Sequence, residues 1–499
     1  MMLAIDRKGP QPLYRQVIDG VRALIDAGTL EAGRALPSSR RLASQLCVDR
    51  TTITQAYAEL QALGYVRSQP GSYTFVQRRG GPGTNAAIAG HVIDWRDRAR
   101  PEAEWACRTY QSHPAEAPAR SSLGPEAVSL AQLDPDPRLF PLGQIHRTFS
   151  QALGGHSAEP FEYGSHQGYP PLRDHLARRM RLHGIAATAE DILVTNGAQQ
   201  ALDLLIRVFG RPGRSVVVEA PTYALIIPLL RLNGAAAAAV PMRDDGMDLD
   251  RLEKVLEKGN AAFVYTMPNF QNPTGITTGH DHRARLLSLC ASRRVPIVED
   301  GFEEDMKYYG KVDLPIKSMD EGNVVIYVGT FSKALFPGLR VGWIAADREC
   351  IRRLTAVKRY TDLTSNHLAQ VFMHRFCEEG HYDKHLRRLH RAYRKRLDLT
   401  LRTMKATFPD SVKWTEPPGG YTLWVKMPKR LSRAELEAFL APYGVIVSAG
   451  QNYFLGAAAS EYFRLCIART DEEEIRAGVS RLGRALRDRF GVSEGGKKR

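Results

Sequence analysis

Short apolar runs alternate with helical stretches after residue 127, and this alternation limits the fold more than any other feature of the chain. Each run ends at Gly, Pro, Asn or Asp, as the buried strands of a mostly parallel sheet do. In open α/β sheets, ligands bind at the carboxyl ends of the strands, so the polar residues after the runs are candidate site residues. The runs are Ile192–Val194, Ser215–Val218, Ala262–Tyr265, Pro296–Val298 and Val324–Val328.

The N-terminal part has a different pattern, which predicts short helices followed by a hairpin. Apolar residues recur at helical spacing over Leu13–Ile25, and Pro37 with the two serines after it provides a second helix start. Asp49 is a suitable N-cap for a third helix, which Gly64 ends. The two strands are expected at 65–67 and 73–76, with a turn at 69–72.

A segment rich in Gly, Pro, Ala and Arg separates these two patterns. It has little periodicity and is expected to be a long flexible linker, with a DNA-contacting arm as the alternative. The chain of 499 residues is also too long for one hydrophobic core. We expect a first domain at 1–78, the linker at 79–124, a second domain at 125–490 and a basic tail at 491–499.

The chain carries a net charge of +15, which favours a polyanionic partner. Residues 1–80 hold eleven Arg and Lys against six Asp and Glu, and residues 375–405 hold ten against four. The second stretch could equally be a solvated helix face. The six cysteines form no CxxC pair, which argues against a metal site or a disulfide framework. With no secretory signal and no apolar run of about 18–20 residues, the expected location is the cytoplasm.

The segments Leu36–Ala43 and Val48–Tyr57 resemble the GntR-type winged helix, which implies binding to double-stranded DNA. The first turns of a recognition helix read bases, while nearby arginines bind phosphates. The wing tip reads Gly71-Ser72-Tyr73 where the family has Gly-Ser-Gly, a departure that bears on minor-groove contact. A winged helix used only for protein contacts is the alternative. The expected base readers are Arg50, Thr51, Thr52 and Gln55, and the expected phosphate contacts are Arg40, Arg41 and Arg67.

Lys333 lies in Thr-Phe-Ser-Lys and is followed by Pro-Gly-Leu-Arg. Several further sequence motifs occur in the same order as in the class I, fold-type I aminotransferases, and residues 128–486 resemble that family. The resemblance implies an α/β domain that binds pyridoxal 5'-phosphate. The amine of Lys333 would form a Schiff base with the cofactor aldehyde. Arg340, Ser332 and Thr330 would pair with its phosphate.

The same resemblance assigns three more cofactor contacts. Asn196–Gln200 follows a strand and opens a helix, so backbone amides such as those of Ala198 and Gln199 would hold the phosphate. Asp300 would keep the pyridine nitrogen protonated, which makes the ring an electron sink. Asn272 would bind the phenolic oxygen.

Other residues are expected to contact the ring face, the substrate or the partner subunit. Tyr223 would stack on the ring, and Tyr163 resembles a tyrosine that reaches the phosphate of the neighbouring subunit. Arg464 would hold a substrate α-carboxylate with its planar fork. Phe302 stands where the family has a tyrosine that tunes the imine, which argues against efficient transamination. The segment Pro268–Pro273 looks most like the aminoadipate and kynurenine aminotransferases.

Together the three parts resemble the MocR-type transcriptional regulators over nearly the whole chain. The resemblance implies a head-to-tail homodimer that binds an operator. We expect the aminotransferase-like domain to sense an amine or amino acid by aldimine exchange at Lys333, with Arg464 on the effector's carboxylate.

Two other functions fit the same residues. The first is an active aminotransferase with an attached DNA-binding domain, in which Lys333→Ala abolishes turnover. A transamination half-reaction is compatible with either function. The second is a sensor of pyridoxal phosphate itself, whose response would survive Arg464→Ala. Effector, operator and sign of regulation are not encoded in these patterns.

Overall fold

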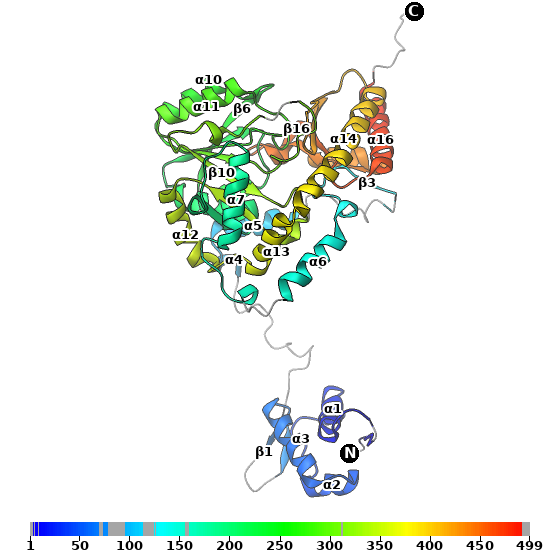
Figure 1. Ribbon diagram of the computed structural model, residues 1–499. Helices are drawn as coiled ribbons and strands as arrows, with labels where there is room; N and C mark the ends of the chain where they lie inside the picture. The colour runs from blue at the N-terminus through cyan, green and yellow to red at the C-terminus, as the bar shows by residue number, and fades with distance from the viewer. Residues whose placement is uncertain are drawn as a thin grey trace, which may run out of the picture. The chain divides into compact units, whose positions relative to one another are not determined.

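The chain forms two compact units, Met1–Ala99 and Arg100–Arg499 (Figure 1). In the part of the chain that the structure describes, no helix is long and apolar enough to cross a bilayer. The computed structural model describes residues 3, 5–7, 9–68, 73–77, 95–112, 124, 126–154, 159–310 and 313–491.

The first unit has the helices and hairpin that the sequence predicts. Asp49 begins the third helix by accepting a hydrogen bond from the Thr51 amide at 2.7 Å. Val17, Val21 and Leu60 are fully buried in the core between the helices. The turn expected at 69–72 lies outside the described residues. The elements are α1 (Leu13–Asp26), α2 (Ser39–Leu46), α3 (Arg50–Ala62), β1 (Val66–Ser68) and β2 (Thr74–Val76).

The segment expected to be a flexible linker contains helices. One of them, α5 (Pro101–Ser112), packs on α9 (Ile226–Leu232) of the second unit. There Arg231 lies over the ring of Trp105 at 4.1 Å. The linker prediction therefore does not hold for α5, because this packing orders a helix that the composition concealed. The short helix before it is α4 (Trp95–Arg98).

The second unit is built on an eight-stranded sheet, counted over its described residues, with the order β4-β11-β10-β9-β8-β5-β6-β7. Strands from β10 to β6 run parallel, and β11 is antiparallel to both neighbours. All five predicted strands are present, whereas β6, β7 and β11 were missed; β6 is rich in alanine, a weak strand former. The strands are β4 (Ile192–Thr195), β5 (Ser215–Ala220), β6 (Ala236–Arg243), β7 (Gly246–Met247), β8 (Ala261–Thr266), β9 (Ile297–Asp300), β10 (Val325–Thr330) and β11 (Gly342–Ala345).

Both faces of this sheet are buried. Val216 and Val218 of β5 belong to one apolar cluster, while Val217 between them belongs to another. Such two-sided burial explains why the strands are continuous apolar runs without alternation. The helices of this part are α6 (Leu142–Leu153), α7 (Pro170–Leu182), α8 (Gly197–Phe209), α10 (Leu249–Leu256), α11 (His280–Ser292), α12 (Arg348–Asp362) and α13 (His367–Glu378).

A smaller sheet with the order β12-β13-β16-β15 forms a second core near the C-terminus. The long helix α14 (His381–Thr407) packs against α16 (Glu472–Phe490) beside it (Figure 1). Residues 127–133, called the strap from here on, pair with β14 and lie beside this sheet, where the Leu130 carbonyl accepts a hydrogen bond from the Cys466 amide at 2.8 Å. The remaining elements are β3 (Val128–Ser129), β12 (Lys413–Trp414), β13 (Thr422–Ser432), α15 (Arg433–Leu440), β14 (Val445–Ile446), β15 (Ser448–Ala449) and β16 (Ala459–Cys466).

Candidate functional site

The fold brings the predicted cofactor residues to the carboxyl ends of the central strands. Asp300 ends β9, and Thr330, Ser332 and Lys333 lie at and just after the end of β10, its parallel neighbour. Arg464 comes from β16 of the smaller sheet. Parallel neighbours end at one edge of a sheet, so residues far apart in sequence meet there.

Asp300 is a buried carboxylate that is held on one oxygen. The hydroxyl of Tyr265 donates to its Oδ2 at 2.7 Å, while Oδ1 is buried and has no partner in the described residues. Burial raises the pKa of Asp300 to about 6, against the opposing effects of the Tyr265 hydrogen bond, the Phe302 backbone amide and the nearby Lys333 charge. An acceptor with one open oxygen fits a protonated pyridine nitrogen.

The Lys333 side chain lies close enough to Asp300 for its charge to act on that carboxyl. Its Nζ donates to the carbonyl of Leu133 in the strap at 3.0 Å. Its own carbonyl accepts from the Tyr421 hydroxyl at 2.7 Å, which fixes the backbone that carries the amine. The side chain is therefore held by one neutral contact that a bond to a cofactor could replace.

A close backbone cradle lies at the start of α8. Gly197 has φ of +76°, and a Cβ there would lie 2.7 Å from the guanidinium of Arg340. Arg340 donates to the Asn196 carbonyl at 3.0 Å. A Cβ at Gly342 of β11 would meet the Ala198 amide at 2.9 Å. These contacts bring Arg340 to the amino end of a helix, the arrangement that binds a phosphate.

Two further groups border this cradle. The hydroxyl of Thr330 donates to Ser332 Oγ at 3.0 Å, and the Ser332 amide donates back to Thr330 Oγ1 at 3.1 Å. The Tyr223 hydroxyl donates to Gln199 Oε1 at 3.2 Å, which places Tyr223 beside the start of α8. All the predicted phosphate contacts within one chain thus lie around the same site.

Arg464 is a buried arginine whose fork binds two polar groups. Nη1 donates to Asn272 Oδ1 at 3.0 Å, and Nη2 donates to the carbonyl of Ala131 in the strap at 2.6 Å. Its guanidinium lies over the ring of Tyr453 at 5.3 Å. The structure thus joins the predicted carboxylate-binding and phenol-binding residues directly.

Two buried side chains of this site, Tyr265 and Glu303, were not predicted from the sequence. Tyr265 has no motif around it, and only its position at the end of a predicted strand pointed to the site. Glu303 follows Phe302, is fully buried, and accepts a hydrogen bond from the Tyr421 amide at 3.1 Å. Burial raises the pKa of Glu303 to about 8, although the charge of Lys333 opposes the shift. Phe302 is buried in the core and brings no hydroxyl to the site.

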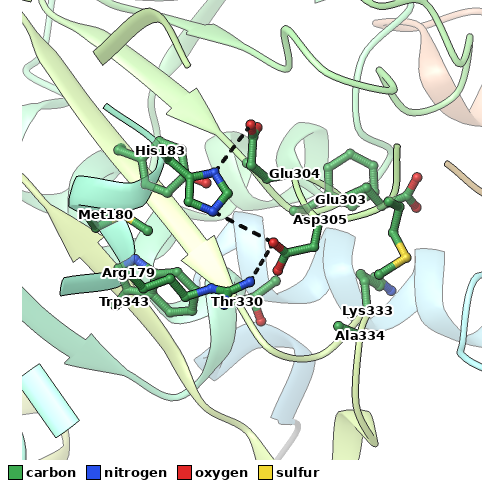
Figure 2. A pocket seen from close by; sticks show the side chains of 14 residues that line it. Arg179, Met180, His183, Glu303, Glu304, Asp305, Thr330, Lys333, Ala334 and Trp343 are labelled. Atoms are coloured by element: carbon green, nitrogen blue, oxygen red, sulfur yellow. Dashed lines mark hydrogen bonds and ion pairs between the residues drawn. The ribbon is translucent and has the colours of Figure 1, made fainter. Parts of the chain in front are cut away.

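A small cavity adjoins these groups. Figure 2 shows Lys333 and Glu303 along one side of it. On the other side His183 lies 3.9 Å from the carboxylates of both Glu304 and Asp305. Asp305 also pairs with Arg179 at 2.6 Å, so this side is a closed ionic cluster.

Tyr163 does not reach the site of its own chain. Its side chain is 84% exposed. A contact with a neighbouring subunit therefore stays a prediction.

In the first unit, most of the predicted DNA contacts lie on the surface. Arg40, Arg41, Arg50, Thr51, Gln55 and Arg67 are exposed and Thr52 is half-buried. Arg50 donates to Ser39 of α2 at 3.4 Å. The Thr51 hydroxyl is used by the helix cap, where it donates to Asp49 at 2.6 Å. The start of α3 thus presents arginine and amide groups, while Thr51 is partly committed to its own helix.

A lysine, an aspartate and an arginine at the strand ends, with a helix-start cradle beside them, define an aminotransferase domain of fold type I. The chain belongs to the class I and II aminotransferase family, whose profile matches residues 145–482. Residues 13–76 match the gntR family of bacterial regulatory proteins. The chain therefore has the MocR-type combination of a winged helix and an aminotransferase domain.

Three known proteins illustrate the similarity of this chain to aminotransferases and to a MocR regulator. An aromatic-amino-acid aminotransferase of Thermococcus litoralis is 38% identical over 73% of this chain and 88% of its own length. The probable rhizopine catabolism regulatory protein MocR of Rhizobium meliloti is 27% identical over 97% of this chain and 96% of its own. The α-aminoadipate aminotransferase LysN of Thermus thermophilus, solved with N-(5'-phosphopyridoxyl)-L-leucine, has a TM-score of 0.72 at 32% identity, over 79% of this chain and 99% of its own.

The cofactor of this family is pyridoxal 5'-phosphate. The residues present fit it on two structural grounds. Asp300 keeps one buried oxygen open, and the cradle at Gly197 has no room for a side chain next to Arg340.

Proposed function

We propose that this protein is a DNA-binding transcription regulator whose aminotransferase domain captures an amine or amino acid at Lys333. One observation carries the proposal: a lysine beside a buried, half-satisfied aspartate occurs in the same chain as a gntR-type DNA-binding domain. When bound, pyridoxal phosphate supplies an aldehyde carbon that holds a primary amine as a reversible imine. An effector amine can take the place of the Lys333 amine without any other reactant.

The residues of the site have separate roles in this proposed capture. Asp300 holds the proton of the pyridine nitrogen, and Tyr265 keeps that carboxylate oriented. Arg340 and the start of α8 bind the phosphate. Arg464 selects effectors with a carboxylate, since its fork matches that group.

The strap is the element through which capture changes the protein. The hydrogen bond from Lys333 to the Leu133 carbonyl would be lost with the lysine amine bound to the cofactor and restored once an effector displaced the lysine. A carboxylate on Arg464 competes with the Ala131 carbonyl for the same fork. Effector binding therefore acts on two strap carbonyls at once, and it shifts the DNA-binding equilibrium by its differential affinity for the two strap positions.

The working form that we propose is a head-to-tail homodimer in the cytoplasm, bound to a double-stranded operator. Tyr163 would then reach the phosphate in the partner's site. The side chain of Tyr163 is 84% exposed, so it is accessible to a partner subunit. Arg40, Arg41 and Arg67 would bind phosphates of the operator, and the first turn of α3 would read its bases.

The test uses DNA fragments that the wild-type protein selects from a genomic library. Their dissociation constants are measured with the cofactor alone and with a panel of amines and amino acids, for wild type and Lys333→Ala. We expect at least one effector to change the wild-type constant and none to change that of the variant. Equal and effector-insensitive binding by both proteins would sink the proposal.

An active aminotransferase is the second candidate, favoured by the 38% identity to the Thermococcus litoralis enzyme and by the intact Asp300–Tyr265 pair. Phe302 argues against it, because the site lacks the hydroxyl of the family's tyrosine. Steady-state conversion of an amino acid and a 2-oxo acid, lost in Lys333→Ala, would establish it. A sensor of pyridoxal phosphate alone is distinguished by an unchanged response in Arg464→Ala.

A further inference from the structure

One face of α14 carries a row of basic side chains that the proposed site does not use. These residues recur every three or four positions as far as Lys395 and again from Arg402, two turns further on, so they lie along one side of the helix. The helix has 27 residues, and the row spans roughly 30 Å at about 1.5 Å per residue. The exposed members, here called the α14 basic face, are Lys384, Arg387, Arg388, Arg391, Arg394, Lys395, Arg402 and Lys405.

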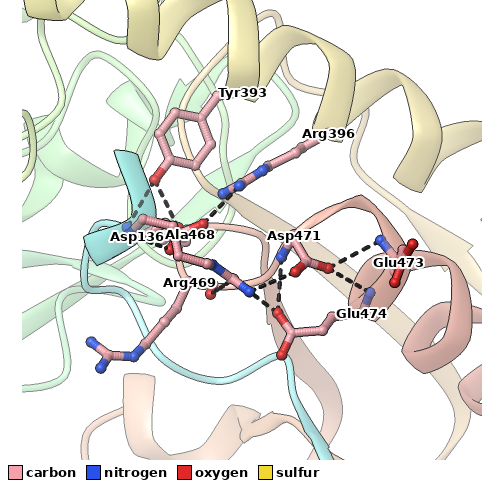
Figure 3. Close-up of polar contacts among 9 residues, drawn as sticks. Asp136, Tyr393, Arg396, Ala468, Arg469, Asp471, Glu473 and Glu474 are labelled. Atoms are coloured by element: carbon pink, nitrogen blue, oxygen red, sulfur yellow. Dashed lines mark hydrogen bonds and ion pairs between the residues drawn. The ribbon is translucent and has the colours of Figure 1, made fainter. Parts of the chain in front are cut away.

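The opposite side of α14 is fixed against the domain by a buried polar network (Figure 3). Arg396 pairs with Asp136 at 2.7 Å, and both side chains are almost completely buried. The Tyr393 hydroxyl donates to the Ala468 carbonyl at 2.7 Å and accepts from the Asp136 amide at 3.2 Å. The inward arginine is thus neutralised, and the helix cannot roll to bury its outer face.

The acidic groups close to the α14 basic face are occupied. Asp383 lies 3.6 Å from Arg179, and Asp398 accepts from the Tyr309 hydroxyl at 2.6 Å. Glu416 pairs with Lys405 at 3.1 Å. Six basic residues of the face have no acidic partner among the residues that the structure describes: Lys384, Arg387, Arg388, Arg391, Lys395 and Arg402.

Two adjacent exposed arginines of α12, in contrast to these six residues, have an acidic partner. There Glu349 pairs with both Arg352, at 2.8 Å, and Arg353. Glu349 and its two arginines are a self-contained surface cluster. A row of cations without counter-charges repels itself, and a polyanion relieves that repulsion.

We propose that the α14 basic face binds the phosphate backbone of double-stranded DNA that flanks the site held by the winged helix. The proposal rests on DNA binding by the first unit. A duplex presents about one negative charge per 1.7 Å of axis, so a straight row of cations finds phosphates at any sequence. A second copy of the same face is excluded by like charge. Lys and Arg side chains without a base-reading geometry predict affinity and no sequence preference.

The experiment compares the full-length wild type with the triple variant Arg387→Gln/Arg391→Gln/Lys395→Gln. The control variant, Arg211→Gln/Lys254→Gln/Lys258→Gln, removes the same charge from exposed residues that lie before β5, in α10 and just after α10. Figure 1 shows α10 away from α14. Fluorescence anisotropy gives dissociation constants for labelled random-sequence duplexes of about 18 and 60 base pairs over a series of NaCl concentrations. The short duplex reports the winged helix, and the long one offers flanking phosphates.

We expect the α14 variant to bind the long duplex at least tenfold more weakly at low salt, with a salt slope shallower by roughly 2–3, as three lost phosphate contacts require. Its binding to the short duplex should stay within about twofold of wild type and control. Equal slopes for both triple variants on the long duplex would overturn the proposal, and a face that binds an acidic protein would give that result. Loss of short-duplex binding by the wild type itself would instead refute DNA binding by the first unit.

Discussion

Arg464 donates a hydrogen bond to Asn272 at 3.0 Å, although 192 positions separate the two residues in the chain. The residue expected to hold an effector's carboxylate is therefore bonded to the residue expected to hold the cofactor's phenolic oxygen. A carboxylate bound by the same guanidinium would share its five N–H donors with Asn272. We therefore expect amino-acid binding and cofactor binding to influence each other through this contact.

Replacement of Arg464 by Lys should weaken the binding of amino acids much more than the binding of amines without a carboxylate. A lysine keeps the charge but lacks the planar fork that binds a carboxylate through two parallel hydrogen bonds. We expect affinity for amino acids to fall at least tenfold, or about 1.4 kcal/mol, while amines without a carboxylate change little. Absorbance titration of the cofactor-loaded protein with matched amine and amino-acid pairs measures both. Equal losses for the two ligand classes would contradict the carboxylate role.

Tyr265→Phe should weaken cofactor binding without unfolding the domain. The hydroxyl stabilises the Asp300 carboxylate, so its loss raises the pKa of that carboxyl further and weakens the contact with a protonated pyridine. Hydrogen bonds to charged groups contribute about 1.5–3 kcal/mol, so cofactor affinity should fall roughly tenfold or more. Equilibrium dialysis measures it. The control is Tyr393→Phe, which removes an equally buried hydroxyl that donates to the Ala468 carbonyl; an equal loss in both variants would refute a specific role for Tyr265.

Gly197→Ala should abolish the phosphate cradle. A Cβ at this positive φ of +76° would lie 2.7 Å from Arg340 and displace it from the start of α8. The matched control is Gly213→Ala, at φ +80° with no atom within 4 Å of the added carbon. Both carry the same backbone strain of about 1 kcal/mol, but only the first should lose cofactor affinity, by at least tenfold. Similar dissociation constants for the two variants would place the phosphate elsewhere.

The cofactor-free protein should lose stability as the pH rises from 5 to 9, and Glu303→Gln should reduce that loss. Burial raises the pKa of Glu303 from 4.5 to about 8, so in this window the folded state holds a proton that the unfolded chain releases. The unfolded state binds fewer protons, and the free energy of unfolding therefore falls with pH. Gln stays neutral and removes this contribution. Glu219 and Glu299, with pKa values raised by burial to about 7, leave a residual slope.

Thermal unfolding of wild type and variant over this pH series is the measurement. Glu349→Gln is the control, because Arg352 and Arg353 hold the pKa of that carboxyl near 2, below the window. It should leave the slope unchanged. A Glu303→Gln protein with the wild-type slope would mean that this carboxyl is ionised when folded.

Local sequence was sufficient wherever a property depends on neighbours in the chain. The Asp49 cap and the five apolar runs were predicted because helix starts and two-sided burial leave marks within a few residues. β6 was missed, since it is rich in alanine, a weak strand former. β11 was missed although it holds Trp343 and Ile344, which favour strands. The helix α5 was missed for a related reason: the contact of Trp105 with Arg231 spans more than a hundred residues.

The sequence by itself determined the two-part architecture, the lysine predicted to bind the cofactor and its motif, and most of the residues around it, because each lies in a short segment of distinctive composition. Only the tertiary structure decided how those segments meet. It set Tyr265 against Asp300, joined Arg464 to both Asn272 and the strap, and buried Glu303 beside Lys333. It also turned Arg396 of α14 inward to Asp136 and left four other arginines facing outward without acidic partners among the described residues: Arg387, Arg388, Arg391 and Arg402. Burial and pairing across the fold depend on which strands are neighbours and which side of a helix is covered, and no local pattern encodes that.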